Sequence, residues 1–358
     1  MAAVEHPPTC VALVTHEGGA HVSQYLTAIR DLDRIHDAVV VDEDGSVFDQ
    51  AREVLNSKLR GTYDSVDAML QHHHPVMAIV TGSGRRAPGL IRPLLNSGIH
   101  ITAEKPACIN PDDFAALVAL ADANSAHLML ALGNRLKPWV QDARRICRQD
   151  GIGTLYAIRG MTLADQTRIW NADWTHQPWA FKKSEGGGGH LIWLGIHWVD
   201  LILYLTGDHI TEVQAMAPNV GGGPIDVEDL ALVNFRMASG THGSLVSGYL
   251  LDRWYQQDMA IWGSGGWMRY HIQHNGTAEY NELEWHGTQP AMNENPDRNF
   301  KYDEAIGDGG YTPWIRATLR AALGETAAPI TGAEGLEALR VIFAAYESAH
   351  TNRTITLH

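Results

Sequence analysis

The first 134 residues alternate short apolar runs with amphipathic segments, and this alternation limits the possible folds more than any other feature. Strands are predicted at residues 10–14, 38–41, 76–81, 100–103 and 128–131. Helices are predicted between them at residues 22–32, 46–59, 66–71, 89–96 and 111–124. Because strands that alternate with helices are joined by right-handed crossovers, the pattern predicts an α/β domain with a parallel sheet.

The pattern changes near residues 133–138, and we expect two domains, 1–134 and 135–358. A helix at 138–148 and a strand at 155–159 are followed by an apolar helix that begins near residue 191. Further strands are predicted at residues 211–217, 229–236, 243–250, 257–262 and 266–271, and helices at 313–323 and 335–348. These strands predict a large, mostly antiparallel sheet. Residues 167–189 lack a clear period and predict a long loop that approaches a pocket.

Charge and cysteine content exclude several classes of protein. The formal net charge is −14 and no run of Lys or Arg opposes a phosphate backbone, so nucleic acid and anionic membranes are not expected as partners. Three scattered cysteines without metal-ligand spacing predict no metal site and fit a reducing compartment. No secretory signal is visible, so a cytoplasmic protein is expected. The apolar stretch 191–205 contains His197 and Asp200 and predicts a buried helix.

Two motifs resemble those of the Gfo/Idh/MocA family, the relatives of glucose-fructose oxidoreductase and inositol dehydrogenase. The first is Ala103-Glu104-Lys105-Pro106 after a predicted strand, and the second runs from Gly187-Gly188-Gly189 through Gly195-Ile196-His197-Trp198-Val199-Asp200. Supporting pieces are Arg135, Val227-Glu228-Asp229 and Tyr346-Glu347-Ser348-Ala349. The resemblance implies a Rossmann domain that binds NAD or NADP. It also implies a second α/β domain whose open sheet serves in oligomerisation, so a homodimer or homotetramer is expected.

The cofactor-binding residues that the resemblance implies lie at four strand ends. The loop after the first strand supplies His16, Gly18, Gly19 and Ala20, although Thr15 and Glu17 replace the first two glycines of the family pattern. The end of the third strand supplies Thr81, Gly82 and Ser83. The end of the fourth strand supplies Glu104 and Lys105.

The end of the second strand carries Asp42, which is expected to accept hydrogen bonds from the adenosine ribose. Its carboxylate would repel a 2′-phosphate. Glu43 and Asp44 follow, and no Arg or Lys is adjacent in the sequence, so NAD is favoured over NADP. Alternatively, the three acids only solvate a turn.

Catalysis is expected at Lys105 and His197. Alcohol oxidation needs a group that takes the hydroxyl proton and a positive group that stabilises the developing alkoxide. The resemblance implies that Lys105 touches the reacting oxygen and that His197 binds it and exchanges the proton. Pro106 restrains the preceding residues in an extended form, which would aim Lys105 outward from the strand end.

The predicted substrate-binding residues are Arg135, Trp174, His190, Trp193 and His197. Trp193 stands where the family usually carries an Asp one helical turn before the His, so it offers either an apolar face for a sugar ring or core packing. His190 could replace the lost proton relay. Arg135 could bind the substrate or pair with an acid across the interface, and Asp200 is expected to be structural.

Three functions remain open. The first is an NAD-dependent oxidoreductase that acts on a hydroxyl of a sugar, sugar derivative or cyclitol, in either direction. The second is a redox-assisted glycosidase or lyase that uses tightly bound NAD through a transient keto-sugar. The third, suggested by the altered Thr15 to Ala20 loop, is a non-catalytic sensor of sugars or nucleotides.

Overall fold

The computed structural model describes residues 9–16, 18–149, 151–171, 178–274, 279–287, 297–302 and 310–357. The chain forms two compact units. Unit 1 takes the described residues among 1–133, 184–187 and 306–336, and unit 2 takes those among 134–183, 188–305 and 337–358.

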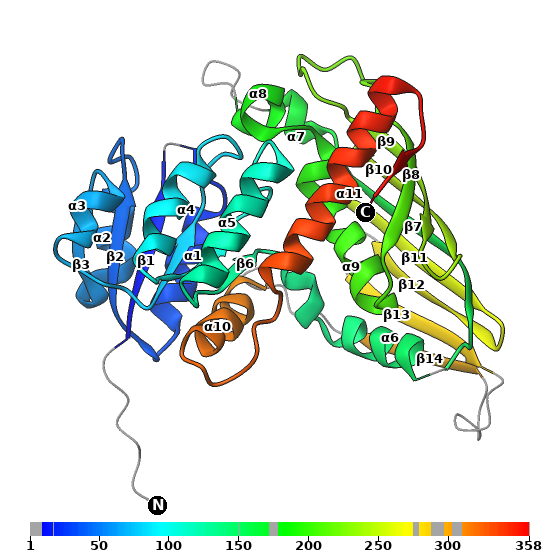
Figure 1. The fold of residues 1–358 in the computed structure, drawn as a ribbon, viewed down its shortest axis with the longest axis horizontal. Coiled ribbons are helices and arrows are strands. Elements are labelled where there is room, and N and C mark those ends of the chain that lie inside the picture. Colours follow the sequence, from blue (N-terminus) through cyan, green and yellow to red (C-terminus); the bar gives the residue numbers. More distant parts are fainter. Residues whose placement is uncertain are drawn as a thin grey trace, which may run out of the picture. The chain divides into compact units, whose positions relative to one another are not determined.

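Unit 1 contains a parallel sheet of six strands in the order β3-β2-β1-β4-β5-β6 (Figure 1). The strands are β1 (Thr9–Thr15), β2 (Ile35–Asp42), β3 (Leu59–Tyr63), β4 (Met77–Val80), β5 (His100–Ala103) and β6 (Leu128–Leu130). This is the strand order of a Rossmann fold, in which ligands bind outside the carboxyl ends of the strands where the order reverses. Here the reversal lies between β1 and β4.

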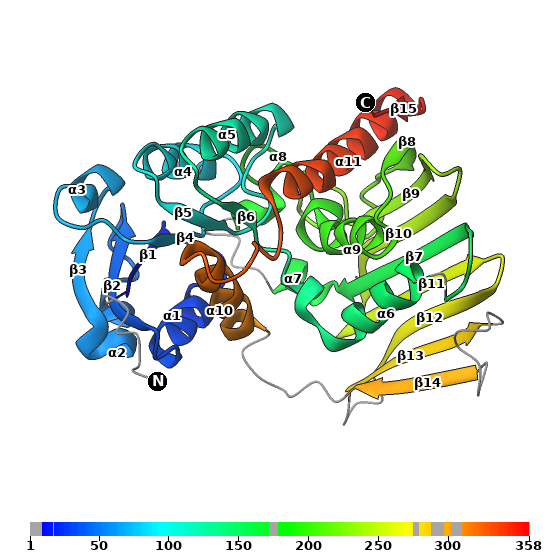
Figure 2. The same ribbon diagram turned by 60° about the horizontal axis from the view of Figure 1, so that its bottom comes forward.

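Helices cover both faces of this sheet (Figure 2). They are α1 (Val22–Asp31), α2 (Phe48–Leu55), α3 (Val66–Leu70), α4 (Ala87–Asn96), α5 (Pro111–Ala123) and α10 (Tyr311–Ala322), with the 3-10 turn η1 (Asn56–Lys58). A second 3-10 turn, η2 (Gly133–Leu136), begins at the last residue of this stretch of unit 1 and continues into unit 2. Their ends follow the sequence: Asn110 caps α5 and Pro111 opens it.

Helix α10 belongs to unit 1, although the sequence analysis assigns its residues to the second domain. Its Trp314 is buried, and the indole N–H donates to Thr102 Oγ1 on β5 at 2.9 Å. The ring of Tyr311 also meets that of Tyr25 on α1 edge to face, with centroids 5.1 Å apart. Burial of these aromatic side chains, which the local sequence pattern does not reveal, attaches residues 310–336 to the first unit.

Unit 2 contains a mixed, mostly antiparallel sheet of nine strands in the order β14-β13-β12-β11-β7-β10-β9-β8-β15. The strands are β7 (Leu155–Asp165), β8 (Ile210–Met216), β9 (Leu230–Met237), β10 (His242–Leu251), β11 (Tyr255–Gly263), β12 (Gly266–His274), β13 (Glu279–Gly287), β14 (Asp297–Tyr302) and β15 (Ile355–Thr356). Strands β7 and β10 pair in parallel, and the other neighbours pair antiparallel. The predicted α/β class, with one parallel and one mostly antiparallel sheet, is confirmed.

The remaining helices are α6 (Pro138–Arg148), α7 (Thr167–Trp170), η3 (Trp179–Phe181), α8 (Lys183–Gly186), η4 (Leu191–Gly195), α9 (Ile196–Thr206) and α11 (Gly332–Thr351). Turn η4 is π-helical and leads directly into α9. Among the described residues, Lys183–Thr206 is the one helical stretch long and apolar enough to cross a membrane, but 78% of its most apolar window is buried inside the protein. The prediction of a buried core helix here is confirmed.

Candidate functional site

Two contacts join the residues at the carboxyl ends of β1 and β4. His16 Nε2 accepts a hydrogen bond from Ser83 N at 2.8 Å. One residue earlier, Thr15 Oγ1 lies 3.3 Å from Thr81 Oγ1. All four residues are buried. The structure therefore brings together the His16 and Ser83 that the sequence analysis nominated, at the point of the sheet where a dinucleotide is expected.

The glycines of the β1–α1 turn are required by their surroundings. Gly18 has a φ of +74°, and a Cβ on Gly19 would lie 2.0 Å from Thr15 Oγ1 and 2.9 Å from the carbonyl oxygen of Thr81. Among the described residues, which exclude Glu17, no side chain caps α1 and no acid lies in its first turn. A helix start of this kind suits a pyrophosphate, so this end of the site fits a dinucleotide despite the substituted glycines.

Asp42 is held within its own turn. Its side chain is fully buried. Oδ2 accepts hydrogen bonds from Ser46 Oγ at 2.9 Å and Val47 N at 3.0 Å, and Oδ1 lies 3.4 Å from Asp44 N. The carboxylate thus holds the turn before α2, and its expected contact with the ribose stays a prediction. The next residue, Glu43, is exposed and pairs with Arg86 at 3.2 Å.

The Glu104-Lys105 motif lies buried at the carboxyl end of β5. Glu104 Oε1 accepts from the Tyr25 hydroxyl at 2.6 Å, and Oε2 accepts from Lys105 N at 3.1 Å. Burial and the Glu104 carboxylate raise the pKa of Tyr25 well above its usual value, so this hydroxyl stays protonated and donates. Glu104 thereby fixes the backbone of Lys105. The Lys105-Pro106 peptide bond is cis.

In unit 2, Gly188 and Gly189 of the glycine motif are contacted by Glu228, in the loop before β9, and by Tyr346 on α11. Glu228 accepts from Gly189 N at 2.7 Å, Leu191 N at 2.9 Å and the Tyr346 hydroxyl at 2.9 Å. A Cβ on Gly189 would lie 1.9 Å from the carbonyl oxygen of Glu228, and one on Gly188 would lie 2.1 Å from the Tyr346 hydroxyl. The three motif pieces that carry the family resemblance in this part of the chain therefore meet in one hydrogen-bonded cluster.

His190 and Trp193 lie in the buried region beside this cluster. His190 Nδ1 is 2.6 Å from Ser247 Oγ, and its ring meets Tyr249 edge to face at 4.5 Å. Trp193 is half-buried and meets Trp179 edge to face at 5.1 Å. The predicted substrate residue Trp174 lies outside the described residues.

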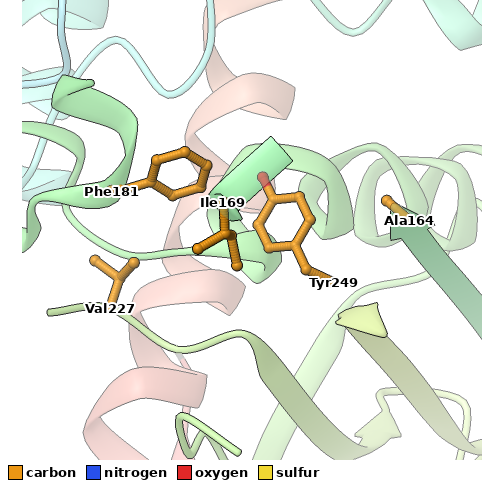
Figure 3. Close-up of a cluster of buried hydrophobic side chains, with 5 residues drawn as sticks. All are labelled: Ala164, Ile169, Phe181, Val227 and Tyr249. Carbon is orange, nitrogen blue, oxygen red and sulfur yellow. The ribbon is translucent and has the colours of Figure 1, made fainter. Parts of the chain in front are cut away.

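Trp193 packs against a hydrophobic cluster (Figure 3). The members drawn there are Ala164, Ile169, Phe181, Val227 and Tyr249, and the rings of Phe181 and Tyr249 meet edge to face with centroids 5.9 Å apart. The position of Trp193 supports core packing, with one part of the ring left accessible.

His197 and Arg135 have different surroundings from each other. His197 is half-buried at the start of α9, and its predicted catalytic role stays a prediction. Arg135 is buried and pairs with Asp200, with Nη2 2.7 Å and Nε 3.0 Å from the carboxylate. Arg135 therefore pairs with an acid, as one of its two expected roles has it, although both residues belong to unit 2 and the pair does not cross an interface. Its contact with substrate stays a prediction. Asp200 is structural, as expected.

The cysteines offer no reactive thiolate. Burial raises the pKa of Cys10 to about 11 and those of Cys108 and Cys147 to about 12. Among the described residues, no three His, Cys, Asp or Glu side chains are grouped to hold a metal ion.

Sequence reasoning missed two residues at the candidate cofactor end, Glu185 and Tyr25. Glu185 accepts from Ser83 Oγ at 3.3 Å and pairs with Arg85, so it holds the loop after β4. Tyr25 holds Glu104. Tyr25 follows the helical period of α1 and has the sequence signature of a core residue, so no local signal distinguishes it.

Comparison with known proteins agrees with this fold and these motifs. The model of the oxidoreductase family with an NAD-binding Rossmann fold, Gfo/Idh/MocA, matches residues 16–132, and the model of that family's C-terminal domain matches residues 140–269. Levoglucosan dehydrogenase from Pseudarthrobacter phenanthrenivorans is 31% identical over 173 residues, which cover 42% of this chain and only 43% of that protein. UDP-N-acetylglucosamine 3-dehydrogenase from Acidithiobacillus ferrooxidans is 28% identical over 245 residues, 68% of this chain and 67% of that protein.

A solved structure extends the likeness of fold over nearly the whole chain. The WlbA dehydrogenase from Bordetella pertussis, in complex with NADH and UDP-GlcNAcA, aligns with a TM-score of 0.79 at 20% identity. The alignment covers 98% of this chain and 99% of that one. Together with the two matching family models, these observations identify the chain as a member of the Gfo/Idh/MocA family of NAD-binding oxidoreductases.

Proposed function

We propose that the chain is an NAD-dependent dehydrogenase that oxidises a hydroxyl of a sugar, sugar derivative or cyclitol, or catalyses the reverse reduction. The observation that carries the proposal is the buried Lys105 at the carboxyl end of β5, with its backbone held by Glu104. The two dehydrogenases with the matches described above act on levoglucosan and UDP-N-acetylglucosamine according to their names, which supports a carbohydrate substrate.

Lys105 supplies the positive charge that the reaction needs. As a hydroxyl is oxidised, negative charge develops on its oxygen, and an ammonium in a water-poor site stabilises that charge strongly. NAD, when bound at the strand ends of unit 1, supplies the acceptor for the hydride. The bonds from Tyr25 to Glu104 and from Lys105 N to Glu104 orient Lys105 before the substrate arrives.

The first turn and the loop after β4 would hold the cofactor. Gly18, Gly19 and the start of α1 would face the pyrophosphate, while His16 and Ser83 keep the two loops in register. His197 is proposed to exchange the substrate proton. We also propose a cytoplasmic homodimer or homotetramer, with NAD preferred over NADP.

The purified protein should reduce NAD in the presence of at least one compound from a panel of anhydrosugars, nucleotide sugars and cyclitols. Absorbance at the NADH maximum measures this reaction, and release of a chromogenic aglycone from aryl glycosides is followed in parallel. Aglycone release without net NADH would instead support the redox-assisted glycosidase. Binding of NAD and sugar without either signal would support a sensor and contradict the dehydrogenase proposal.

A further inference from the structure

A charged pair lies at the carboxyl end of β2, beside the position expected for the adenosine ribose. Glu43 Oε2 is 3.2 Å from Arg86 Nη1, and the two side chains are 72% and 48% exposed. Glu43 directly follows β2, and Arg86 directly precedes α4. Since β2 and β4 both pair with β1, the residues that follow these two strands lie on either side of the β1–α1 turn.

The backbone that carries Arg86 is fixed. Arg86 N donates to the carbonyl oxygen of Ser83 at 3.0 Å, and Ala87 N donates to the same oxygen at 2.9 Å. The guanidinium is nevertheless accessible, since the Arg86 side chain is 48% exposed. Its ion pair with Glu43 contributes little stability, because it is exposed to solvent. By contrast, Asp42 is fully buried and uses its carboxylate to hold the turn before α2.

We infer that Glu43 and Arg86, and not Asp42, read the 2′ position of the adenosine ribose. Glu43 would accept a hydrogen bond from the 2′-hydroxyl of NAD, and Arg86, once released from Glu43, would bind the 2′-phosphate of NADP. This inference rests on the proposed binding of a nicotinamide cofactor. Because the exposed Asp44 adds a second negative charge and Arg86 is the opposing cation, NAD is preferred while NADP binding remains measurable.

Titration calorimetry with NAD and NADP tests the assignment without a substrate. Glu43→Gln should lower the ratio of the NADP Kd to the NAD Kd by about tenfold or more, because it removes the carboxylate and frees Arg86. Arg86→Met should raise the same ratio by about tenfold by weakening NADP, with the NAD Kd changed by less than about threefold.

Two controls make the result specific. Arg85→Met removes the neighbouring guanidinium, which pairs with Glu185 and not with Glu43, and should leave the ratio unchanged. Asp42→Asn should lower the melting temperature and also leave the ratio unchanged, because Asp42 acts within its turn. An altered ratio in Asp42→Asn or Arg85→Met, with none in Glu43→Gln and Arg86→Met, would overturn the inference. Wild-type protein that binds neither cofactor would instead contradict the proposed function itself.

Discussion

Each unit contains a glycine-rich turn that leads into a helix, and the two turns use the N–H groups of their helix in different ways. In unit 1, residues 15–21 precede α1, and among the described residues no side chain caps that helix. In unit 2, residues 188–190 precede η4, and Glu228 accepts hydrogen bonds from Gly189 N and Leu191 N. The N-cap residue of α1, His21, makes no side-chain capping bond, whereas the start of η4 is occupied by a carboxylate of the protein itself.

The glycines are needed in both turns for the same steric reason. A Cβ on Gly19 would come within 2.0 Å of Thr15 Oγ1, and a Cβ on Gly189 within 1.9 Å of the Glu228 carbonyl oxygen. A glycine motif before a helix therefore indicates that another group, from a ligand or from the protein itself, approaches the backbone closely. The tertiary structure decides between the two, because it shows which group accepts hydrogen bonds from the N–H groups at the helix start.

The largest effect on folding is expected from Glu228→Ala. The substitution leaves Gly189 N, Leu191 N and the Tyr346 hydroxyl without their acceptor, and each unsatisfied buried donor costs about 1–3 kcal/mol. We expect the free energy of unfolding to fall by about 3 kcal/mol or more in urea denaturation. Asp226→Asn is the matched control, because Asp226 accepts from Lys183 N at an exposed position. Equal small losses in both variants would mean that Glu228 does not close the second turn.

Gly19→Ala should act mainly on cofactor binding. The added methyl group must displace Thr15 Oγ1 and lies 2.9 Å from the Thr81 carbonyl oxygen, so the first turn cannot keep its shape. We expect the NAD Kd to rise about tenfold or more, with about 1–2 kcal/mol lost from folding. Gly89→Ala is the control, since a Cβ there meets nothing within 4 Å. An unchanged NAD Kd in Gly19→Ala would show that the first turn does not hold the cofactor.

A smaller effect concerns the charge of Glu228. Burial raises the pKa of this carboxyl above its usual value, although the hydrogen bonds from Leu191 N, Gly189 N and Tyr346 lower it in part. A carboxyl whose pKa is raised in the folded state is protonated below its ordinary pKa of about 4.3, and there it costs no stability. As the pH rises above that value, its ionisation lowers the free energy of unfolding. The stability of the wild type relative to Glu228→Gln should therefore decline from about pH 4 upward. A relative stability that increases with pH would show that the turn holds the carboxylate as an anion.

The secondary structure that could be predicted from the sequence is the part with strong apolar periodicity. Strand β5 and helix α6 lie at the predicted residues. Strand β3 was not predicted because it contains Gly61 and is only half-buried at the edge of its sheet. Strand β13 was not predicted either, because it alternates Leu283 and Trp285 with glutamates and its apolar content is low.

The site was less predictable, because its contacts join residues far apart in the sequence. Glu43 and Arg86 are 43 residues apart, so the absence of a neighbouring Arg in the sequence did not exclude one in space. Asp42 stands at the expected strand end, but bonds within its own turn bury it. Arg135 pairs with Asp200 across 65 residues. In each case the sequence pattern did not identify the partner that the structure shows.

The central claim is that Lys105 stabilises the oxygen of a substrate hydroxyl beside bound NAD. Lys105→Met keeps most of the apolar stem and removes the charge. On the substrate identified from the panel, the variant should lose about 100-fold or more in kcat/KM, the scale seen when a donor to a developing oxyanion is removed. Its calorimetric Kd for NAD and its melting temperature should stay close to those of the wild type. A folded, NAD-binding variant with near-normal turnover would contradict the account.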